Sequence, residues 1–567
     1  MHVATHAWHA MPRSLATVQW VDRLQKKPQS LCPDPVFSSQ TSEGGHVAFV
    51  STARLEDDLL KDWSNRIFEK GFDTILGLSV GKNGCPFVDN PHSDVCIPVT
   101  KLFRSLDACL NEESLRQRRG HWSETDIRKE EKEHQIDECL TSAMKAFVAR
   151  WFPLIPHRNY DVVGQDEALI RESWRMARKA MLRVVNHASY RSILALYLFS
   201  QTPIPVGIPE EEELMGISGL ICIHTALLQI QRLRERQKTC QYFGSQVSAW
   251  IDAIARSVPT PGLTETHLDF ETRAFWAAVI WDTSSSLTSN FRSSLTSGLK
   301  GACLEPVWRL ARTFLVGSLH SRTDQLRTKT LEVSDEVASQ ILSAASVCQL
   351  YLWKTATSLK EAFREGVEEE SVLSSWGAVL DAIDIFQSSI RPLLNACERQ
   401  LHFLNQLNRF SWYQFSLQYH LGILIIVDAL EAAGRSDLLA DFAETRCDAE
   451  HESFNTLKLG IESKFTIHEL GYVPTTVSRS DRLDHSITAS FISIDPYPHH
   501  VIDSVILMGN FIIDKYCKGK MTDETYSYLS STLLTSLQQL PQSSKSVQAS
   551  QKTLQQSFER AKFVNIR

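Results

Sequence analysis

Apolar residues recur every three or four positions along most of the chain after residue 140, which is the spacing of an amphipathic helix. Ile341, Ala345 and Cys348, for example, lie on one face of a helix predicted over 337–363. No alternation of apolar and polar residues is long enough to predict a sheet. The pattern therefore predicts an all-α fold built as one large multi-helix domain. Further helices are predicted over 189–199, 216–236, 270–287, 374–407 with a break at Pro392, 412–433, 501–518 and 522–540.

The same pattern divides the chain into three parts. Residues 1–50 are rich in Pro, Ser, Gln and Gly, with little periodicity, so we expect a largely disordered segment. Residues 51–139 are predicted as a partly ordered linker region, and residues 140–560 as the all-α domain. A chain of 567 residues exceeds the ~250–300 at which a single core stops growing, so two cores or one extended helical array are expected. No 30–45-residue motif recurs, which argues against a standard repeat solenoid.

Composition narrows the range of functions. The net charge is −7, so a broad nucleic-acid-binding surface, which needs a basic footprint, is not expected. The 12 cysteines are spread singly, and the closest pair is Cys85 and Cys96, so we expect buried thiols and no metal cluster. The start of the chain has no apolar signal-peptide core, and the longest apolar run, 421–427, is too short for a bilayer that needs ~20 residues. We therefore expect a soluble protein without a membrane partner.

One segment, 271–282, combines aromatic, basic and acidic residues in a specific order. Arg273 is followed by the pair Phe275 and Trp276, and Asp282 follows Trp276 after five residues. Phe275 and Asp282 are seven positions apart and so share one helical face. Elementary packing predicts that the two aromatic residues lie between helices and that Asp282 pairs with a buried Arg or caps a helix.

This order resembles the signature helix of the fungal-specific transcription-factor domain, the middle homology region of zinc-binuclear-cluster regulators. Thr283 stands where that family usually has Arg, and no Gly-Arg-Pro follows. Phe152-Pro153-Leu-Ile-Pro-His157 is similar to the start of the same domain, and 190–200, 222–229 and 412–438 resemble later helices of the alcohol-utilisation-regulator subgroup. The resemblance implies a nuclear transcription regulator whose partners are the transcription machinery or co-regulator proteins. It leaves open a small inducer and a homodimer.

The family's six-cysteine zinc cluster, which reads DNA, has no counterpart here. Either that module was lost, or the sequence is incomplete, or the protein acts without touching DNA. The resemblance therefore implies no DNA-binding, catalytic or metal-binding residue in this chain. No cofactor is expected, and zinc is expected only if a missing N-terminal cluster exists.

Two alternatives remain. The first is an all-α terpenoid-type enzyme, which would bind magnesium through Asp57, Asp58 and Asp62. Its second ligand set would include Asn290 and Ser294, although Gly298 stands where a Glu is needed. The second alternative is a helical interaction scaffold unrelated to transcription. A phosphate loop at 77–83 is disfavoured, because its glycine spacing is one residue short and Asn83 replaces the hydroxyl residue that would hold magnesium.

Overall fold

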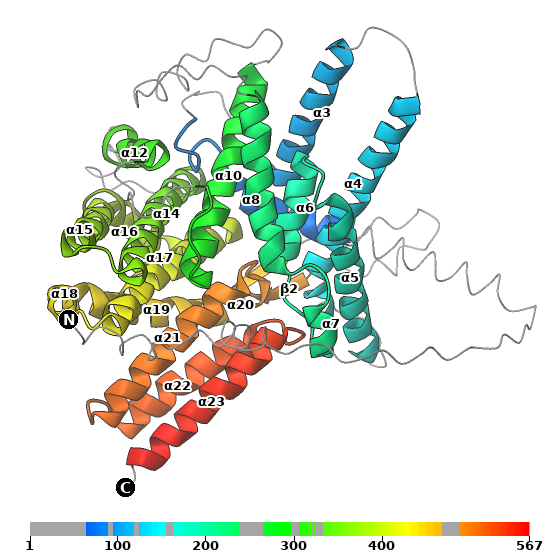
Figure 1. Cartoon of the computed structure of the whole chain (residues 1–567). Helices are drawn as coiled ribbons and strands as arrows, with labels where there is room; N and C mark the ends of the chain where they lie inside the picture. The colour runs from blue at the N-terminus through cyan, green and yellow to red at the C-terminus, as the bar shows by residue number, and fades with distance from the viewer. Residues whose placement is uncertain are drawn as a thin grey trace, which may run out of the picture.

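The computed structural model describes residues 64–88, 94–117, 124–154, 163–237, 265–295, 305–319, 323, 333–467 and 487–565. These residues are mostly helical, which confirms the predicted all-α class (Figure 1). The prediction of disorder for residues 1–50 falls outside the described residues. The α-helices are α2 (Thr74–Ser79), α3 (Val99–Gln117), α4 (Glu124–Ala149), α5 (Val163–Val184), α6 (Tyr190–Ser200), α7 (Glu210–Leu214), α8 (Gly219–Gln237), α10 (Glu265–Ser289), α12 (Pro306–Thr313), α14 (Asp335–Glu365), α15 (Glu369–Ile385), α16 (Arg391–Arg399), α17 (Gln406–Ala432), α18 (Ser436–Asp441), α19 (Ala443–Glu462), α20 (Phe491–Ile494), α21 (Pro498–Cys517), α22 (Asp523–Gln539) and α23 (Lys545–Asn565).

The helices form three neighbouring groups. In the N-terminal group, α4 packs on α5 and α6, and α6 packs on α3 and α8. In the central group, α14 packs on α15 and α17, and α17 packs on α19. The C-terminal group is the bundle of α21, α22 and α23, which projects from the rest of the molecule in Figure 1. Helix α10 touches α3 and α8 on one side and α14 on the other, so it joins the N-terminal group to the central group.

A single hydrophobic core runs through all three groups. Its buried residues extend from Ile67 near the start of the described chain to Ala561 near the end. Phe68, Phe72 and Phe103 are fully buried in this core. The core therefore begins well before residue 140, where the sequence pattern placed the start of the helical domain.

Helix α15 ends in a π-helical turn, η6 (Phe386–Ile390), directly before α16. Proline has no N–H to donate and its ring crowds the preceding turn, so a regular helix cannot pass through Pro392. The wider π turn accommodates this interruption. The predicted break at Pro392 is therefore a π-helical turn within a continuous helical run, 369–399, and the chain does not leave the helical conformation there.

The expectation of no sheet is wrong in one place. Strands β1 (Lys464–Ile467) and β2 (Ile487–Ser490) pair antiparallel, with Phe465 opposite Ala489 and Ile467 opposite Ile487. Each strand has only four residues, which is too short to produce a readable alternation of apolar and polar positions.

Two stretches of the described chain are long and apolar enough to cross a membrane by length and composition alone. In Gln406–Ala432, which is α17, 67% of the apolar window is buried, as expected for a core helix. In Glu210–Glu235, which spans α7 and α8, only 39% of the window is buried. The second stretch therefore carries apolar residues that the core does not use.

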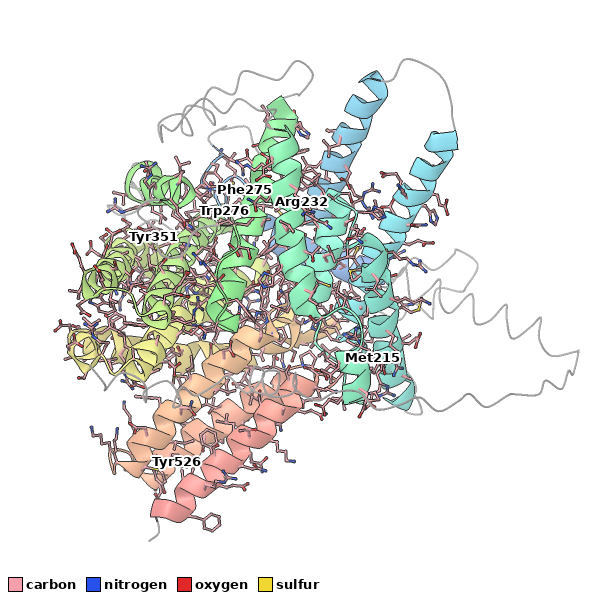
Figure 2. All side chains as sticks on the ribbon, viewed as in Figure 1. Met215, Arg232, Phe275, Trp276, Tyr351 and Tyr526 are labelled. Atoms are coloured by element: carbon pink, nitrogen blue, oxygen red, sulfur yellow. The ribbon has the colours of Figure 1, made fainter. Side chains whose placement is uncertain are left out.

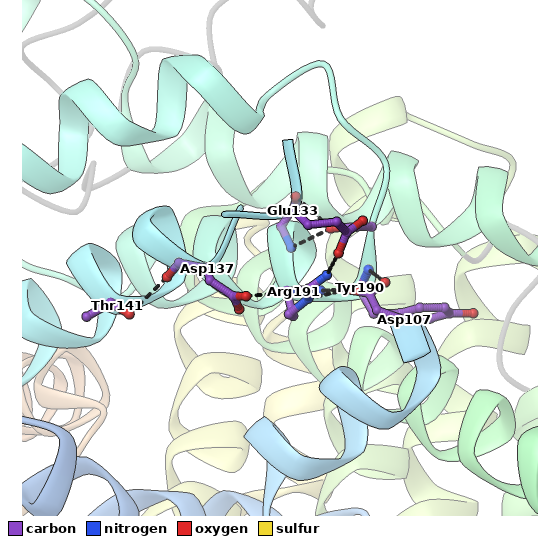
Figure 3. Close-up of polar contacts among 8 residues, drawn as sticks. Asp107, Glu133, Asp137, Thr141, Tyr190 and Arg191 are labelled. Atoms are coloured by element: carbon purple, nitrogen blue, oxygen red, sulfur yellow. Dashed lines mark hydrogen bonds and ion pairs between the residues drawn. The ribbon is translucent and has the colours of Figure 1, made fainter. Parts of the chain in front are cut away.

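A buried arginine connects three helices of the N-terminal group (Figure 3). Arg191 at the start of α6 donates from Nε to Asp107 of α3 over 2.8 Å and pairs with Glu133 and Asp137 of α4. Asp107 also accepts the backbone N–H groups of Tyr190 and Arg191, which have no partner within the first turn of α6. Burial raises the pKa of Asp107, and its hydrogen bonds to Arg191 and to the two backbone N–H groups oppose that effect. The cluster holds the first turn of α6 against α3 and α4.

Helices α14 and α17 approach closely at a glycine, and this contact gives a stability prediction. A Cβ at Gly422 would lie 2.8 Å from Cδ1 of Trp353. We expect Gly422→Ala to lower the free energy of unfolding by about 1–3 kcal/mol through overpacking. Gly377, an exposed position inside α15 with no neighbour within 4 Å, is the matched control. Gly377→Ala should raise stability by about 0.5–1 kcal/mol, because Ala is the better helix former. Equal effects of the two substitutions in denaturant titrations would contradict the packing described.

Candidate functional site

Helix α10 contains all four signature residues and distributes them to different neighbours. Figure 2 shows Phe275 and Trp276 in the middle of the helix, between α8 and the α12–α14 region. Trp276 and Arg273 are fully buried, and Asp282 is 2% exposed. Phe275 is only partly buried. The predicted burial of Trp276 is confirmed.

Arg273 and Trp276 hold a loop that lies far away in sequence. The indole Nε1 of Trp276 donates to the carbonyl oxygen of Gly84 over 2.7 Å. The guanidinium of Arg273 donates to the carbonyl oxygen of Val80 over 2.7 Å and to Asp269, one turn earlier in α10, over 2.8 Å. Phe87 and Trp308 pack edge-on against the Trp276 ring. Two buried side chains of α10 therefore fix the backbone of residues 80–84.

Gly81 of that loop and Gly77 of α2 allow close backbone packing. A Cβ at Gly81 would lie 1.8 Å from the carbonyl oxygen of Val95, and one at Gly77 would lie 2.4 Å from that of Ile97. Since backbone atoms cannot give way, only glycine fits at these two positions. Close backbone packing therefore explains the glycines at 77–83, and a phosphate-binding loop is not needed to explain them.

Phe275 contacts α8 instead of the loop. The guanidinium carbon of Arg234 lies 3.7 Å from the centre of the Phe275 ring, within cation–π range. Arg234 also lies 3.5 Å from the carboxylate of Glu271, one turn before Phe275. Phe275 and Trp276 thus pack between helices as predicted, but toward opposite neighbours.

Asp282 fixes the chain that follows α10. Its two carboxylate oxygens accept the backbone N–H groups of Ser294 and Leu295 over 2.8 and 3.0 Å. The chain reverses at Asn290, whose φ of 57° lies in the left-handed region. Both roles predicted for Asp282, pairing with a buried Arg or capping a helix, are wrong: its carboxylate holds the loop that follows α10.

The same loop is tied to α14 by charged side chains. Arg364 donates to the carbonyl oxygen of Asn290 over 3.0 Å, and Lys360 donates to that of Leu287 over 2.8 Å. Arg292 lies 3.0 Å from the buried carboxylate of Glu361. These contacts make the end of α10 a polar junction between α10 and α14.

A buried lysine lies beside this junction. Lys354 of α14 is fully buried, and its Nζ lies 3.7 Å from the carboxylate of Glu305. Burial lowers the pKa of Lys354, and the nearby carboxylates of Glu305, Asp282 and Glu361 oppose that effect. Burial likewise raises the pKa of Asp282. Perturbed groups of this kind occur both in catalytic sites and in structural ion-pair networks, and here each charged group lies beside an opposite charge.

A second polar cluster joins Arg150, which directly follows α4, to Asp495, which lies between α20 and α21. Arg150 donates to the carbonyl oxygens of Phe147 and Gln201 over 2.8 and 3.2 Å. Asp495, 1% exposed, accepts the backbone N–H of Tyr497 over 2.9 Å. Burial raises the pKa of Asp495 to about 6, although the hydrogen bond from the Tyr497 backbone N–H and the positive charge of Arg150 oppose the shift.

A small cavity of about 20 Å³ borders both α10 and Tyr497. The hydroxyl groups of Tyr197 and Tyr497 lie 3.3 Å apart at its wall, and the Trp281 ring stacks on Tyr197 with centroids 3.8 Å apart. The remaining wall comes from α2, Val80, α3 and α10, and it is apolar except for Ser79. A space of this size takes a water molecule or a very small neutral ligand.

One pair of side chains has the spacing of a nucleophile and a base. Ser284 Oγ lies 3.2 Å from Nε2 of His500. A catalytic His needs a partner that orients its other nitrogen, but His500 Nδ1 has no hydrogen-bond partner among the residues that the structure describes. His500 is 2% exposed and packs between the rings of Tyr497 and Trp353, and burial lowers its pKa. The pair fits an interior hydrogen bond better than a reaction centre.

The other residues considered for metal binding are not brought together. Asp57, Asp58, Asp62 and Gly298 lie outside the described residues. The Oγ of Ser294 lies 3.2 Å from Nδ1 of His224, on the side of α8. Among the residues that the structure describes, no group of three or more His, Cys, Asp or Glu is placed to hold a metal ion.

Comparison of the chain with protein-family models, with curated proteins and with solved structures finds no match. The functional interpretation therefore depends on the residues themselves.

The Trp276 contacts give a graded stability prediction. Trp276→Ala removes a fully buried ring and should lower the free energy of unfolding by about 3–5 kcal/mol. Trp276→Phe keeps most of the apolar volume but leaves the Gly84 carbonyl without its donor, so we expect a smaller loss of about 1–3 kcal/mol. Chemical denaturation followed by circular dichroism measures both. A loss below about 1 kcal/mol for Trp276→Ala would show that the ring does not hold the loop.

Asp495 gives a pH prediction. Its pKa is about 6 in the folded protein and about 3.9 in an unfolded chain, so folding favours the protonated form. The stability from this group is fully present below pH ~3.9 and is lost as the pH rises to ~6. Relative to Asp495→Asn, which cannot titrate, the wild type should lose about 2–3 kcal/mol between pH 4 and pH 7. A stability difference between the two proteins that stays constant over this range would contradict the prediction.

Proposed function

We propose that this chain is the regulatory region of a transcription regulator, and that it controls gene expression through contacts with other proteins. The observation that carries the proposal is the role of α10. The helix whose residue order resembles the signature of fungal transcription-factor domains is also the helix that joins the N-terminal and central groups. A sequence signature that stabilises a regulatory domain is expected in a helix that connects two of its helix groups.

The charge of the chain supports protein partners. A net charge of −7 disfavours phosphate backbones and suits basic or mixed protein surfaces. In this proposal the protein acts in the nucleus on the transcription machinery or on a co-regulator, and DNA is reached only through a module outside this sequence. In this proposal any small inducer binds elsewhere, because the cavity between Tyr197, Trp281 and Tyr497 has room only for about one water molecule.

A tethering experiment tests the proposal. The full chain fused to a foreign DNA-binding module should change transcription of a matched reporter in a fungal host, tested with and without candidate inducers. Trp276→Ala should remove the response, because it destabilises the domain. Asp384→Ala, at an exposed position of α15, is the control that should keep the response.

The enzyme alternative is tested in the same system. Asp57→Ala combined with Asp58→Ala should leave the reporter response unchanged, because the proposal assigns no metal to these residues. Two results together would replace the proposal with the terpenoid-type enzyme. One is the absence of any reporter response, and the other is magnesium-dependent turnover of a prenyl diphosphate that the double substitution abolishes.

A further inference from the structure

One short segment of the described chain is not held by the core. Residues 209–216, which contain α7, lie between buried Ile208 and buried Ile217, but none of the eight is itself buried. Met215, near the end of the segment, is 71% exposed. Gly216 follows with a φ of 85°, in the left-handed region that glycine adopts without strain. Residues 209–216 are called the α7 strap.

Two ion pairs hold the α7 strap in place. Glu212 accepts hydrogen bonds from Arg175 of α5 over 2.6 and 2.9 Å. Glu213 lies 2.9 Å from Nζ of Lys545, so α7 is placed between α5 and the start of α23 (Figure 1). The four side chains remain between 23% and 40% exposed. Ion pairs that water reaches contribute little each and are screened by salt, so the attachment of the strap is weak and depends on charge.

A third cation contacts the backbone of the strap. Arg178 of α5 lies beneath it and is only 8% exposed. Its guanidinium donates to the carbonyl oxygens of Glu212, Glu213 and Ile217, the last two over 2.7 and 3.0 Å. These contacts do not depend on the side chains of the strap. A cation placed to bind carbonyl groups recognises a polypeptide chain, and a nucleic acid has no such backbone to offer.

Together these cations form a basic patch under the strap. Arg171, Arg175 and Arg178 are three and four positions apart, so they lie on one face of α5. Arg171 pairs with Glu167 over 3.3 Å, and Lys545 completes the patch from α23. In a chain of net charge −7, the patch is a local surface that suits a negatively charged partner. Arg171, Arg175, Arg178 and Lys545 are called the strap patch.

From this arrangement we infer that the α7 strap is an autoinhibitory mimic of an acidic peptide. The strap patch then binds a partner protein through a segment with consecutive carboxylates. Glu212 and Glu213 occupy the places of two acidic side chains of that segment, and the carbonyl groups on Arg178 occupy the place of its backbone. The inference does not depend on the transcriptional role.

The strap sets the affinity for the partner. Because it is part of the same chain, it competes at a high effective concentration. The apparent affinity of a partner is reduced by the fraction of molecules in which the strap is open. Changes that weaken the strap without altering the strap patch should therefore strengthen partner binding.

Fluorescence polarisation of the full-length protein tests this competition. The probe is a labelled peptide with the sequence of residues 209–216, which contains four consecutive glutamates. Glu212→Gln combined with Glu213→Gln removes both ion pairs of the strap, so this variant should bind the probe about three- to tenfold more tightly than the wild type. A peptide with glutamine in place of the four glutamates should not bind.

A further substitution tests the strap patch itself. Arg175→Gln, added to the double variant, should weaken probe binding by about three- to tenfold, because it removes a two-bond contact to a carboxylate. Arg183→Gln is the matched control, since Arg183 is an exposed residue of the same helix outside the patch, and it should leave binding unchanged. Equal circular dichroism spectra and melting temperatures would show that the variants are folded.

Hydrogen exchange measures the opening of the strap independently. The backbone N–H groups of Glu213 and Met215 bond to Pro209 and Glu212 inside the strap. Both amides should exchange faster in the double variant, and in the wild type at about 1 M salt, where charges are screened within about 3 Å. The amides of α6 should not change.

Three outcomes would overturn the inference. In the first, the double variant binds the acidic peptide no more tightly than the wild type. In the second, the glutamine peptide binds as well as the acidic one, or Arg183→Gln weakens binding as much as Arg175→Gln. In the third, the open variant binds a single-stranded DNA oligonucleotide more tightly than the acidic peptide, and Arg175→Gln abolishes this, so that the strap patch is a nucleic-acid site instead.

Discussion

The structure depends most on the two hydrogen bonds by which α10 holds the loop at residues 80–84. Trp276 and Arg273 reach carbonyl groups that are 192 and 193 residues earlier in the chain. Both bonds are buried, so losing either would leave a carbonyl without a donor inside the core. Because α10 also contacts α14, these bonds connect the first described helices to the central group. Other contacts also join distant parts of the core, such as the bond from Trp151 Nε1 to the carbonyl oxygen of Ser493 over 2.8 Å.

Much of the fold could be predicted from the sequence, because the helices are long and their apolar faces are regular. The burial of Trp276, the interruption at Pro392 and the stop at Gly434, which adopts a φ of 69°, all follow from local chemistry. The two short strands could not be predicted, because four residues give no period to read.

The long-range partners in the candidate site could not be predicted either. The spacing of residues 77–84 does not predict that α10 contacts them. The Arg191 cluster likewise joins residues up to 84 positions apart. Helix α8 is apolar on both sides in its first half, so periodicity cannot separate its core side from its exposed side. Tertiary contacts decide these points, and a single sequence does not display them.

Native-state hydrogen exchange tests the central claim, that α10 and the loop at residues 80–84 form one cooperative unit, most directly. The amides of residues 81–88 and those in the middle of α10 should open with the same free energy, and Trp276→Phe should lower both by the same amount. Amides of α22, in the C-terminal group, serve as the internal reference. Their free energy of opening by local unfolding should be the same in the wild type and in Trp276→Phe. If Trp276→Phe loosens the loop while the protection of α10 stays unchanged, the loop is a local appendage and the account is wrong.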